Sequence, residues 1–281
     1  MLTLDFTGIY ENEEFDFYKE TTPRSLFVSK YISLKDISGT NCICDDFAIE
    51  EIKKRIRKGL MNTPGAGSDE EEKGAYSENP RISVFDNGNY HYMSRILMEI
   101  LVEDMKEESS FDLIVFDHHP DMKWTSYGDV LSCGCWVLSA LKDIRGLKYV
   151  YIIGADKKLM KEAYADTPET IDRVHYFEDF SLFKKSIDSG ETNIAEKIYI
   201  SVDKDVVSKD ELLTNWDQGD MSIDELINAL DYFEEKYHDK ILAVDVCGEC
   251  APDSEDGYLP NGFSKSNRLN DNIISIFLKT L

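Results

Sequence analysis

An apolar run near the middle of the sequence ends in a cluster of acids and imidazoles, Asp117-His118-His119-Pro120-Asp121. The run at 111–116 is short, apolar and rich in β-branched and aromatic side chains, which predicts a buried strand. In parallel α/β sheets, ligand-binding groups collect outside the carboxyl ends of the strands. Alternate residues of an extended segment share a face, so Asp117, His119 and Asp121 are expected to converge. Carboxylates with imidazole suit Mn²⁺ or Zn²⁺; a polar turn after a strand is the alternative.

Two further strand ends carry side chains of the same kind. A predicted strand at 81–85 leads through a tight turn into a predicted helix at 90–105, and His91 lies near the start of that helix. Another predicted strand, 197–203, ends in Asp203-Lys204-Asp205, where the two acids share a face. Four carboxylates and two imidazoles exceed the needs of one ion and suit a pair of metals that activate one water. The carboxylate-rich set favours Mn²⁺ over Zn²⁺.

Strands alternate with helices along the rest of the chain, which predicts a mostly parallel sheet covered on both faces. Further strands are expected at 2–10, 148–154, 174–177 and 241–246, and helices after an N-cap at Asp45 or Asp46 and at 131–141, 157–164, 180–189, 222–237 and 270–281. The segment Thr63–Pro80 is rich in Gly, Pro, Ser and acids, so we interpret about 62–80 as a surface loop. A domain boundary there is the alternative to one α/β domain over 1–281.

Charge and composition narrow the class of partner. The chain has 55 acidic and 31 basic residues, a net charge of −24, which disfavours nucleic acid and anionic membranes and helps a cationic small molecule approach. An acidic surface that aids solubility is the alternative explanation. No apolar run approaches the roughly 18–20 residues of a membrane span, and the N-terminal residues do not resemble a signal peptide. Six cysteines without such a signal predict reduced thiols in a cytoplasmic protein.

The three motifs resemble those of the ureohydrolase family, which includes arginases, agmatinases and formimidoylglutamases. That family has a glycine-rich turn with a His, then D-x-H-x-D, then S-x-D-x-D; the matching segments here are 87–91, 117–121 and 201–205, and the likeness spans roughly residues 80 to 250. The resemblance implies a three-layer α/β/α sandwich of the arginase type and assembly into trimers or hexamers. It implies six manganese ligands, with Asp121 also orienting the attacking hydroxide: His91, Asp117, His119, Asp121, Asp203 and Asp205.

The chain departs from the family pattern mainly where that family handles its substrate. Asn-Tyr precedes His91 in place of the usual G-G-D, and Ser208-Lys209 stand where D-P is usual. Residues 214–219 replace a glycine-rich loop, and the segment 132–136 has no His. The family's late D-x-x-E, whose Glu grips the guanidinium, is matched only loosely, by Asp245 and, one residue further on, Glu249. The resemblance is therefore stronger for the metal centre than for the substrate pocket.

These observations predict a hydrolase with two Mn²⁺ per chain that cleaves a C–N bond of a guanidino or amidino small molecule. Asp121 would orient the nucleophile and Glu249 would hold a cationic substrate, while the absent His argues against arginine itself. One alternative is a deacetylase of the related histone-deacetylase type, which would need one metal and a His-His pair, found only at His118-His119. A second is a metal-binding protein without catalysis. Three cysteine pairs are interpreted as free buried thiols, with a structural zinc or redox pair as the alternative: Cys42/Cys44, Cys133/Cys135 and Cys247/Cys250.

Overall fold

A single parallel sheet forms the centre of the protein. The computed structural model describes residues 1–19, 29–61, 81–125, 128–195, 197–250 and 262–278. Within these residues, eight parallel strands pair in the order β2-β1-β4-β10-β9-β5-β7-β8. They are Leu2–Asp5 (β1), Lys30–Ser33 (β2), Arg81–Phe85 (β4), Phe111–Phe116 (β5), Leu147–Ile153 (β7), Val174–Phe177 (β8), Ile198–Asp203 (β9) and Ile241–Cys247 (β10). A separate antiparallel pair joins β3 (Ile43–Cys44) to β6 (Leu131–Ser132).

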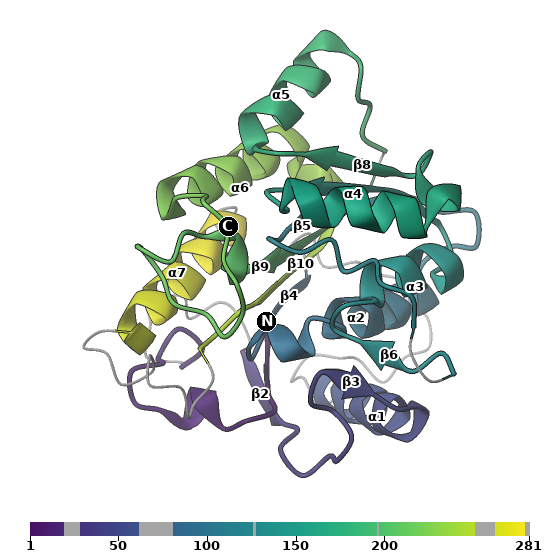
Figure 1. Ribbon diagram of the computed structural model, residues 1–281. Coiled ribbons are helices and arrows are strands. Elements are labelled where there is room, and N and C mark those ends of the chain that lie inside the picture. Colours follow the sequence, from purple (N-terminus) through teal and green to yellow (C-terminus); the bar gives the residue numbers. More distant parts are fainter. Residues whose placement is uncertain (20–28, 62–80, 126–127, 196, 251–261, 279–281) are drawn as a thin grey trace.

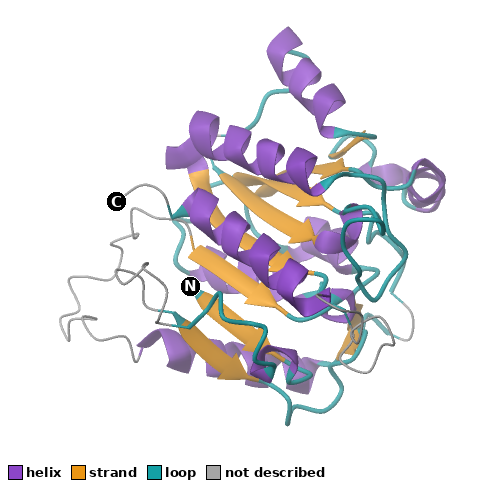
Figure 2. Cartoon of the chain, turned by 90° about the vertical axis from the view of Figure 1, so that its left-hand side faces the viewer, coloured by secondary structure: helices purple, strands orange, loops and turns teal. Residues whose placement is uncertain are grey.

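Helices cover both faces of this sheet (Figures 1 and 2). Four of them share one hydrophobic core, α1 (Asp46–Met61), α2 (Met93–Glu103), α3 (Trp136–Asp143) and α4 (Lys157–Asp166), and three share the other, α5 (Phe180–Ser189), α6 (Ile223–Tyr237) and α7 (Gly262–Phe277). The central strands divide between the two cores because their side chains alternate: Leu113 and Val115 enter the first core, and Ile114 and Phe116 the second. The predicted three-layer α/β/α sandwich is confirmed.

Several element boundaries differ from the predictions. The predicted helix at 131–141 begins only at Trp136, because Leu131–Ser132 pairs with β3 as a strand. The first strand ends at Asp5 rather than at 10, since the chain turns at Gly8 (φ +86°) into the short 3-10 helix Ile9–Glu11. The last helix begins at Gly262, eight residues before the predicted start at 270. The predicted loop at 62–80 lies outside the described residues. Among the residues that the structure describes, no helix is long and apolar enough to cross a membrane.

Strand order explains why the three motifs meet. The strands β4, β10, β9 and β5 are consecutive neighbours in the sheet, although they are far apart in the sequence. Because all of them are parallel, their carboxyl ends lie at the same edge. The segments that follow β4, β5 and β9 are the three that carry the predicted ligands. The topology therefore brings His91, the Asp117–Asp121 segment and the Asp203–Asp205 segment to one place.

Candidate metal centre

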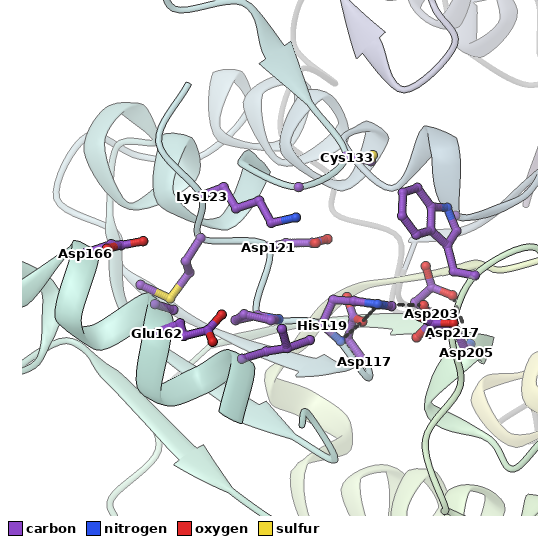
Figure 3. A pocket seen from close by; sticks show the side chains of 17 residues that line it. Asp117, His119, Asp121, Lys123, Cys133, Glu162, Asp166, Asp203, Asp205 and Asp217 are labelled. Atoms are coloured by element: carbon purple, nitrogen blue, oxygen red, sulfur yellow. Dashed lines mark hydrogen bonds and ion pairs between the residues drawn. The ribbon is translucent and has the colours of Figure 1, made fainter. Parts of the chain in front are cut away.

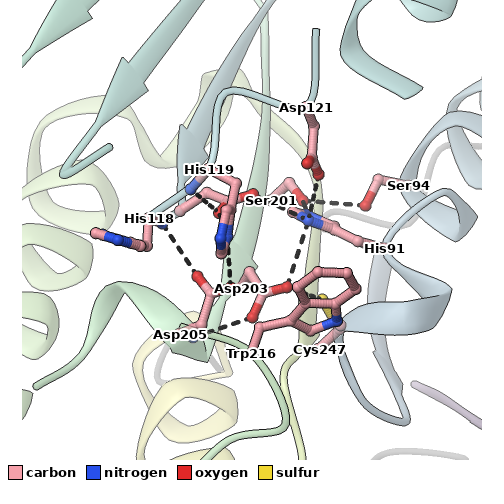
Figure 4. A network of polar contacts seen from close by, with 12 residues as sticks. His91, Ser94, His118, His119, Asp121, Ser201, Asp203, Asp205, Trp216 and Cys247 are labelled. Carbon is pink, nitrogen blue, oxygen red and sulfur yellow. Dashed lines mark hydrogen bonds and ion pairs between the residues drawn. The ribbon is translucent and has the colours of Figure 1, made fainter. Parts of the chain in front are cut away.

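Six side chains gather at this edge, and we call them the acid–imidazole cluster: His91, Asp117, His119, Asp121, Asp203 and Asp205 (Figure 4). His91 Nδ1 lies 3.1 Å from a carboxylate oxygen of Asp117, 3.1 Å from one of Asp121 and 3.5 Å from one of Asp203. His119 Nδ1 lies 2.9 Å from Asp205 Oδ2 and 3.5 Å from Asp117 Oδ1. The structure thus brings together all six residues that the sequence predicts as ligands.

The cluster divides into two groups that share one carboxylate. His91, Asp117 and Asp121 form one group, and Asp117, His119 and Asp205 form the other, with ligand-type atoms within 4.8 Å of one another in each. Asp203, the sixth residue, lies on the His91 side, in a further set of the same kind with His91 and Cys247. His91 Nδ1 and Asp117 Oδ2 are buried and contact each other at 3.1 Å, but neither atom makes a hydrogen bond within the part of the chain that the structure describes. A buried polar atom without a hydrogen bond lowers the stability of the folded chain unless a bound ion or water compensates for the missing partner. A pair of divalent cations fits this arrangement, because each ion would find one imidazole and several carboxylates with Asp117 between them.

Local backbone structure holds these side chains in place. Asp203 ends β9, and its Oδ1 accepts a hydrogen bond from the backbone N–H of Asp205 (3.0 Å), which turns the chain into the 3-10 helix Lys204–Val206. Asp205 Oδ1 in turn accepts from the backbone N–H of His118 (3.0 Å), which joins the second motif to the third. Asp121 has a left-handed backbone (φ +48°), a conformation that Asp tolerates better than most residues and that often occurs at functional sites.

A buried hydrogen-bond chain behind His91 orients this imidazole. Asp245 Oδ1 accepts from Ser201 Oγ (2.7 Å) and Ser94 Oγ (3.1 Å), and Asp245 Oδ2 accepts from the Tyr199 hydroxyl. Because Ser201 donates to Asp245, it is free to accept from His91 Nε2, which lies 3.0 Å away. Nδ1 is therefore the ring nitrogen that faces the carboxylates; burial alone would lower the pKa of His91, but its contacts with Asp117 and Asp121 raise it well above its usual range. Such outer contacts orient metal-binding histidines in many proteins.

The crowding of acids shifts the proton affinities in the cluster. Burial and the charge of Asp117 raise the pKa of Asp121 to about 6. Burial, followed by the charges of Asp203 and Asp117, raises the pKa of Asp205 well above its usual range. Burial alone would lower the pKa of His119, but its contacts with Asp117 and Asp205 outweigh that effect and raise the pKa to about 11. Without a cation, protons on these groups must offset the concentrated negative charge.

A pocket opens beside the cluster (Figure 3). Its volume is about 300 Å³, and its lining includes Asp117, His119, Asp121, Asp203 and Asp205 from the cluster. Three other carboxylates and one amine also line it: Glu162, Asp166, Asp217 and Lys123. The pocket therefore has room for a small molecule and a predominance of negative charge.

The two segments that depart most from the ureohydrolase pattern contact each other at this pocket. Trp216 Nε1 and Asn215 Nδ2 both donate to Asn89 Oδ1 (2.9 Å each), and the backbone N–H of Gly88 donates to Asn215 Oδ1 (3.0 Å). A Cβ at residue 88 would lie 2.6 Å from Trp216 Cδ1, so only glycine allows the indole to pack there. The turn before His91 and the loop after β9 thus build one wall together.

Glu249 is the one predicted site residue that the structure brings neither to the acid–imidazole cluster nor to the pocket. Its buried carboxylate binds Lys204 Nζ (2.6 Å) and accepts from Tyr10 Oη (3.2 Å), Ser266 Oγ and Asn270 Nδ2 (2.8 Å). Gly248, with φ +96°, breaks the alternation of β10 and directs Glu249 away from the cluster. In this structure Glu249 therefore contacts Lys204 and its neighbours and does not line the pocket where we predicted it to hold a substrate. We call these five residues the Lys204–Glu249 cluster.

The structure also places His118 and the six cysteines that the sequence analysis considered. His118 lines a separate cavity with Gly154 and Asp156, so the His118-His119 pair does not face one point. None of the six cysteines forms a disulfide; four of them are buried, as predicted, whereas Cys42 and Cys133 are partly exposed. Sequence reasoning missed Ser94 and Trp136. Ser94 follows His91 by three residues at the start of α2, a spacing that places neighbours on one helical face. Trp136 Nε1 donates to Asp121 Oδ2 (2.6 Å), a contact with no sequence signal.

Comparison with known proteins gives matches at the level of structure alone. No family model and no curated protein matches the sequence. The arginase of Entamoeba histolytica, solved with L-ornithine, superposes with a TM-score of 0.61 at 14% identity, covering 100% of this chain and 98% of that one. The agmatine ureohydrolase of Thermoplasma volcanium gives 0.61 at 15% identity, over 99% and 88%. The formiminoglutamase of Trypanosoma cruzi with Mn²⁺ gives 0.61 at 9% identity, over 99% and 93%. The chain therefore has the arginase-type fold.

Proposed function

We propose that this protein is a divergent ureohydrolase, a metal-dependent hydrolase that cleaves a C–N bond of a guanidino or amidino small molecule. The observation that carries the proposal is the division of the acid–imidazole cluster into two groups that share Asp117, with buried His91 Nδ1 and Asp117 Oδ2 unsatisfied. A single ion would leave the negative charge of one of the two groups without a cation to balance it. Two Mn²⁺ ions, the metal of the T. cruzi formiminoglutamase structure, would supply Lewis acidity that activates water and polarises the carbon under attack.

The chain's own residues would position substrate and proton. Burial and the charge of Asp117 raise the pKa of Asp121 to about 6 in the metal-free chain, but bound cations would keep this carboxylate ionised, so that it would orient the attacking water by accepting a hydrogen bond. The indole N–H of Trp136 holds one oxygen of Asp121 and so orients the carboxylate. Trp216 packs over Gly88 and lies with its ring 5.8 Å from that of His119, which restricts water at this side of the pocket.

The pocket lining supports a cationic substrate. Glu162, Asp166 and Asp217 add negative charge beyond the cluster, and Lys123 is the one lysine or arginine in the described lining. The volume of about 300 Å³ matches the lower end of small-molecule sites. With Glu249 engaged by Lys204 and no His in the segment 132–136, the contacts expected for arginine are missing. We therefore propose a guanidino or formimino compound other than arginine.

The test combines metal stoichiometry with turnover. The metal-free chain is reconstituted with Mn²⁺, the bound metal is measured by native mass spectrometry, and release of urea, ammonia or formamide is followed with a panel of guanidino and formimino compounds. We expect about two ions per chain, and turnover of at least one compound. Asp121→Ala should lose metal and turnover, whereas Asp210→Asn, an exposed carboxylate outside the pocket, should lose neither. One bound ion or none would rule out the dinuclear mechanism.

A metal-binding protein without catalysis is the second candidate. The observation that favours it is the position of Glu249, which leaves the pocket without the carboxylate that the family resemblance assigns to the guanidinium. Binding of about two ions with no turnover across the panel at saturating Mn²⁺ would select this candidate over the enzyme. The deacetylase alternative is not supported, because His118 lines a different cavity from His119.

A further inference from the structure

A buried thiol lies beside the acid–imidazole cluster and has no role in the proposed function so far. Cys247 is the last residue of β10 and is fully buried. In the register of the parallel pair β10–β9, Cys247 lies opposite Asp203. Side chains at paired positions of adjacent strands project to the same side of the sheet. The thiol is therefore directed to the same place as the carboxylate of Asp203, as Figure 4 shows.

The contacts of Cys247 confirm this placement. Its Sγ donates to Asp203 Oδ2 at 3.3 Å. His91, Asp203 and Cys247 present ligand-type atoms within 4.8 Å of one another, and each of the three is buried. At the next residue, Gly248, a Cβ would collide with Asp203 Oδ1 and Lys204 N, so glycine is what allows the end of β10 to approach β9 this closely.

The two groups of the cluster therefore offer different donor atoms. Around His91 stand a nitrogen, carboxylate oxygens and a sulfur, whereas around His119 stand only nitrogen and oxygen. His91 Nδ1 is buried and makes no hydrogen bond among the described residues, so the side of the cluster that holds the thiol also holds an imidazole nitrogen that can bind a cation once its proton is lost. Thiolate ligands favour Zn²⁺ and similarly soft ions over Mn²⁺, while carboxylates favour harder ions.

We infer that Cys247 is a sulfur ligand of the metal bound by His91, so that this position selects Zn²⁺ over Mn²⁺ while the His119 position does not. The inference rests on the proposed dinuclear centre and refines it into two unlike positions. On binding, the Cys247 thiol gives its proton to solvent and the thiolate bonds to the metal ion; no electron is transferred. His91 and Asp203 complete the ligand set on the side of the thiol.

Cobalt(II) tests this directly, because thiolate bound to Co²⁺ produces an intense near-ultraviolet charge-transfer band that imidazole and carboxylate ligands do not. The metal-free full-length chain is titrated with Co²⁺ to saturation while its absorption and bound metal are measured. We expect the band in the wild type and its loss in Cys247→Ser, with Co²⁺ still bound at the His119 position. Cys250→Ser is the matched control, because Cys250 is buried three residues further on and is not grouped with the cluster; its band should remain.

A second measurement needs no variant and so covers the case in which Cys247→Ser fails to fold. Zinc X-ray absorption of the wild-type chain should show a Zn–S distance of about 2.3 Å. Two bound ions with no charge-transfer band and no Zn–S distance would overturn the role of Cys247 and leave the dinuclear centre intact. A band that persists in folded Cys247→Ser would do the same. If no metal binds at all, both the inference and the proposed function are wrong.

Discussion

Two buried polar clusters lie back to back at the carboxyl end of β9, and they differ in how their polar atoms are satisfied. Asp203 and Asp205 belong to the acid–imidazole cluster, while Lys204 between them belongs to the Lys204–Glu249 cluster. In the second cluster the carboxylate of Glu249 has a partner on each oxygen, and Lys204 Nζ also donates to Ser266 Oγ and Asn270 Oδ1. In the first, the buried atoms His91 Nδ1 and Asp117 Oδ2 make no hydrogen bond to any residue that the structure describes.

The difference separates a role in stability from a role in ligand binding. A satisfied buried ion pair ties elements together, and here it joins η5 (Lys204–Val206) to α7 and to the end of β10. An unsatisfied cluster with excess acid lowers the stability of the metal-free chain and gains stability when a cation binds. Burial in itself does not distinguish the two roles; the number of missing partners does.

The largest expected effect comes from breaking the satisfied cluster. Lys204→Met leaves Glu249 as a buried charge without its counterion, so we expect it to lower the free energy of unfolding by about 3–5 kcal/mol. Asp117→Asn should not destabilise the metal-free chain in this way, because it removes charge from a cluster that already has an excess. Both are measured by urea denaturation with a chelator present.

Two further variants serve as controls for the effect of Lys204→Met. Lys35→Met removes an exposed pair with Glu11 and should leave the free energy of unfolding nearly unchanged. The double variant Lys204→Met with Glu249→Leu should recover much of the loss, because no charge remains buried. A loss below about 1 kcal/mol for Lys204→Met would contradict the stabilising role of the pair.

The next effect concerns protons that compete with metal in the unsatisfied cluster. The raised pKa of His119, about 11, means that the metal-free chain holds a proton there at neutral pH, and Asp121, with a pKa of about 6, gains one in mild acid. Metal must displace these protons, so affinity rises with pH. We expect the Mn²⁺ affinity to fall at least about tenfold per unit as the pH drops from about 7 to about 5.

Isothermal titration calorimetry in buffers of different ionisation enthalpy measures both this affinity and the protons released. Release of at least one proton per chain near pH 7 is the expected result. An affinity that does not change between these two pH values would show that the imidazole and the carboxylate do not bind the ion.

The smallest effect should come from an outer contact of the cluster. Trp136→Phe removes the indole N–H that holds Asp121 Oδ2 while it keeps an aromatic ring beside His91. We expect Mn²⁺ affinity to weaken about tenfold to a hundredfold. Trp216→Phe, at the pocket wall, serves as the control and should change metal affinity much less. Equal effects of the two variants would mean that Trp136 acts through packing alone.

The sequence was sufficient for the fold class and for the positions of the six predicted ligands because these depend on local signals. Apolar runs predict strands, and polar groups at the ends of parallel strands meet at one edge. Glu249 could not be placed in this way. A shift of one residue along an extended segment moves a side chain to the opposite face of the sheet. The positive φ of Gly248 then changes the direction of the backbone just before Glu249. Trp136 and β6 depend on contacts between distant segments, which no local pattern encodes.

The shared wall built by Gly88, Asn89, Asn215 and Trp216 has a consequence for evolution. The turn before His91 and the loop after β9 are separated by more than a hundred residues in the sequence, yet each hydrogen-bonds the other. A change in one segment alone would leave an amide or an indole N–H without its partner, so the two segments should change together during divergence. Related chains that share this pocket should therefore carry both N-G-N before the first histidine and N-W after the last ligand, a two-part signature by which to find them.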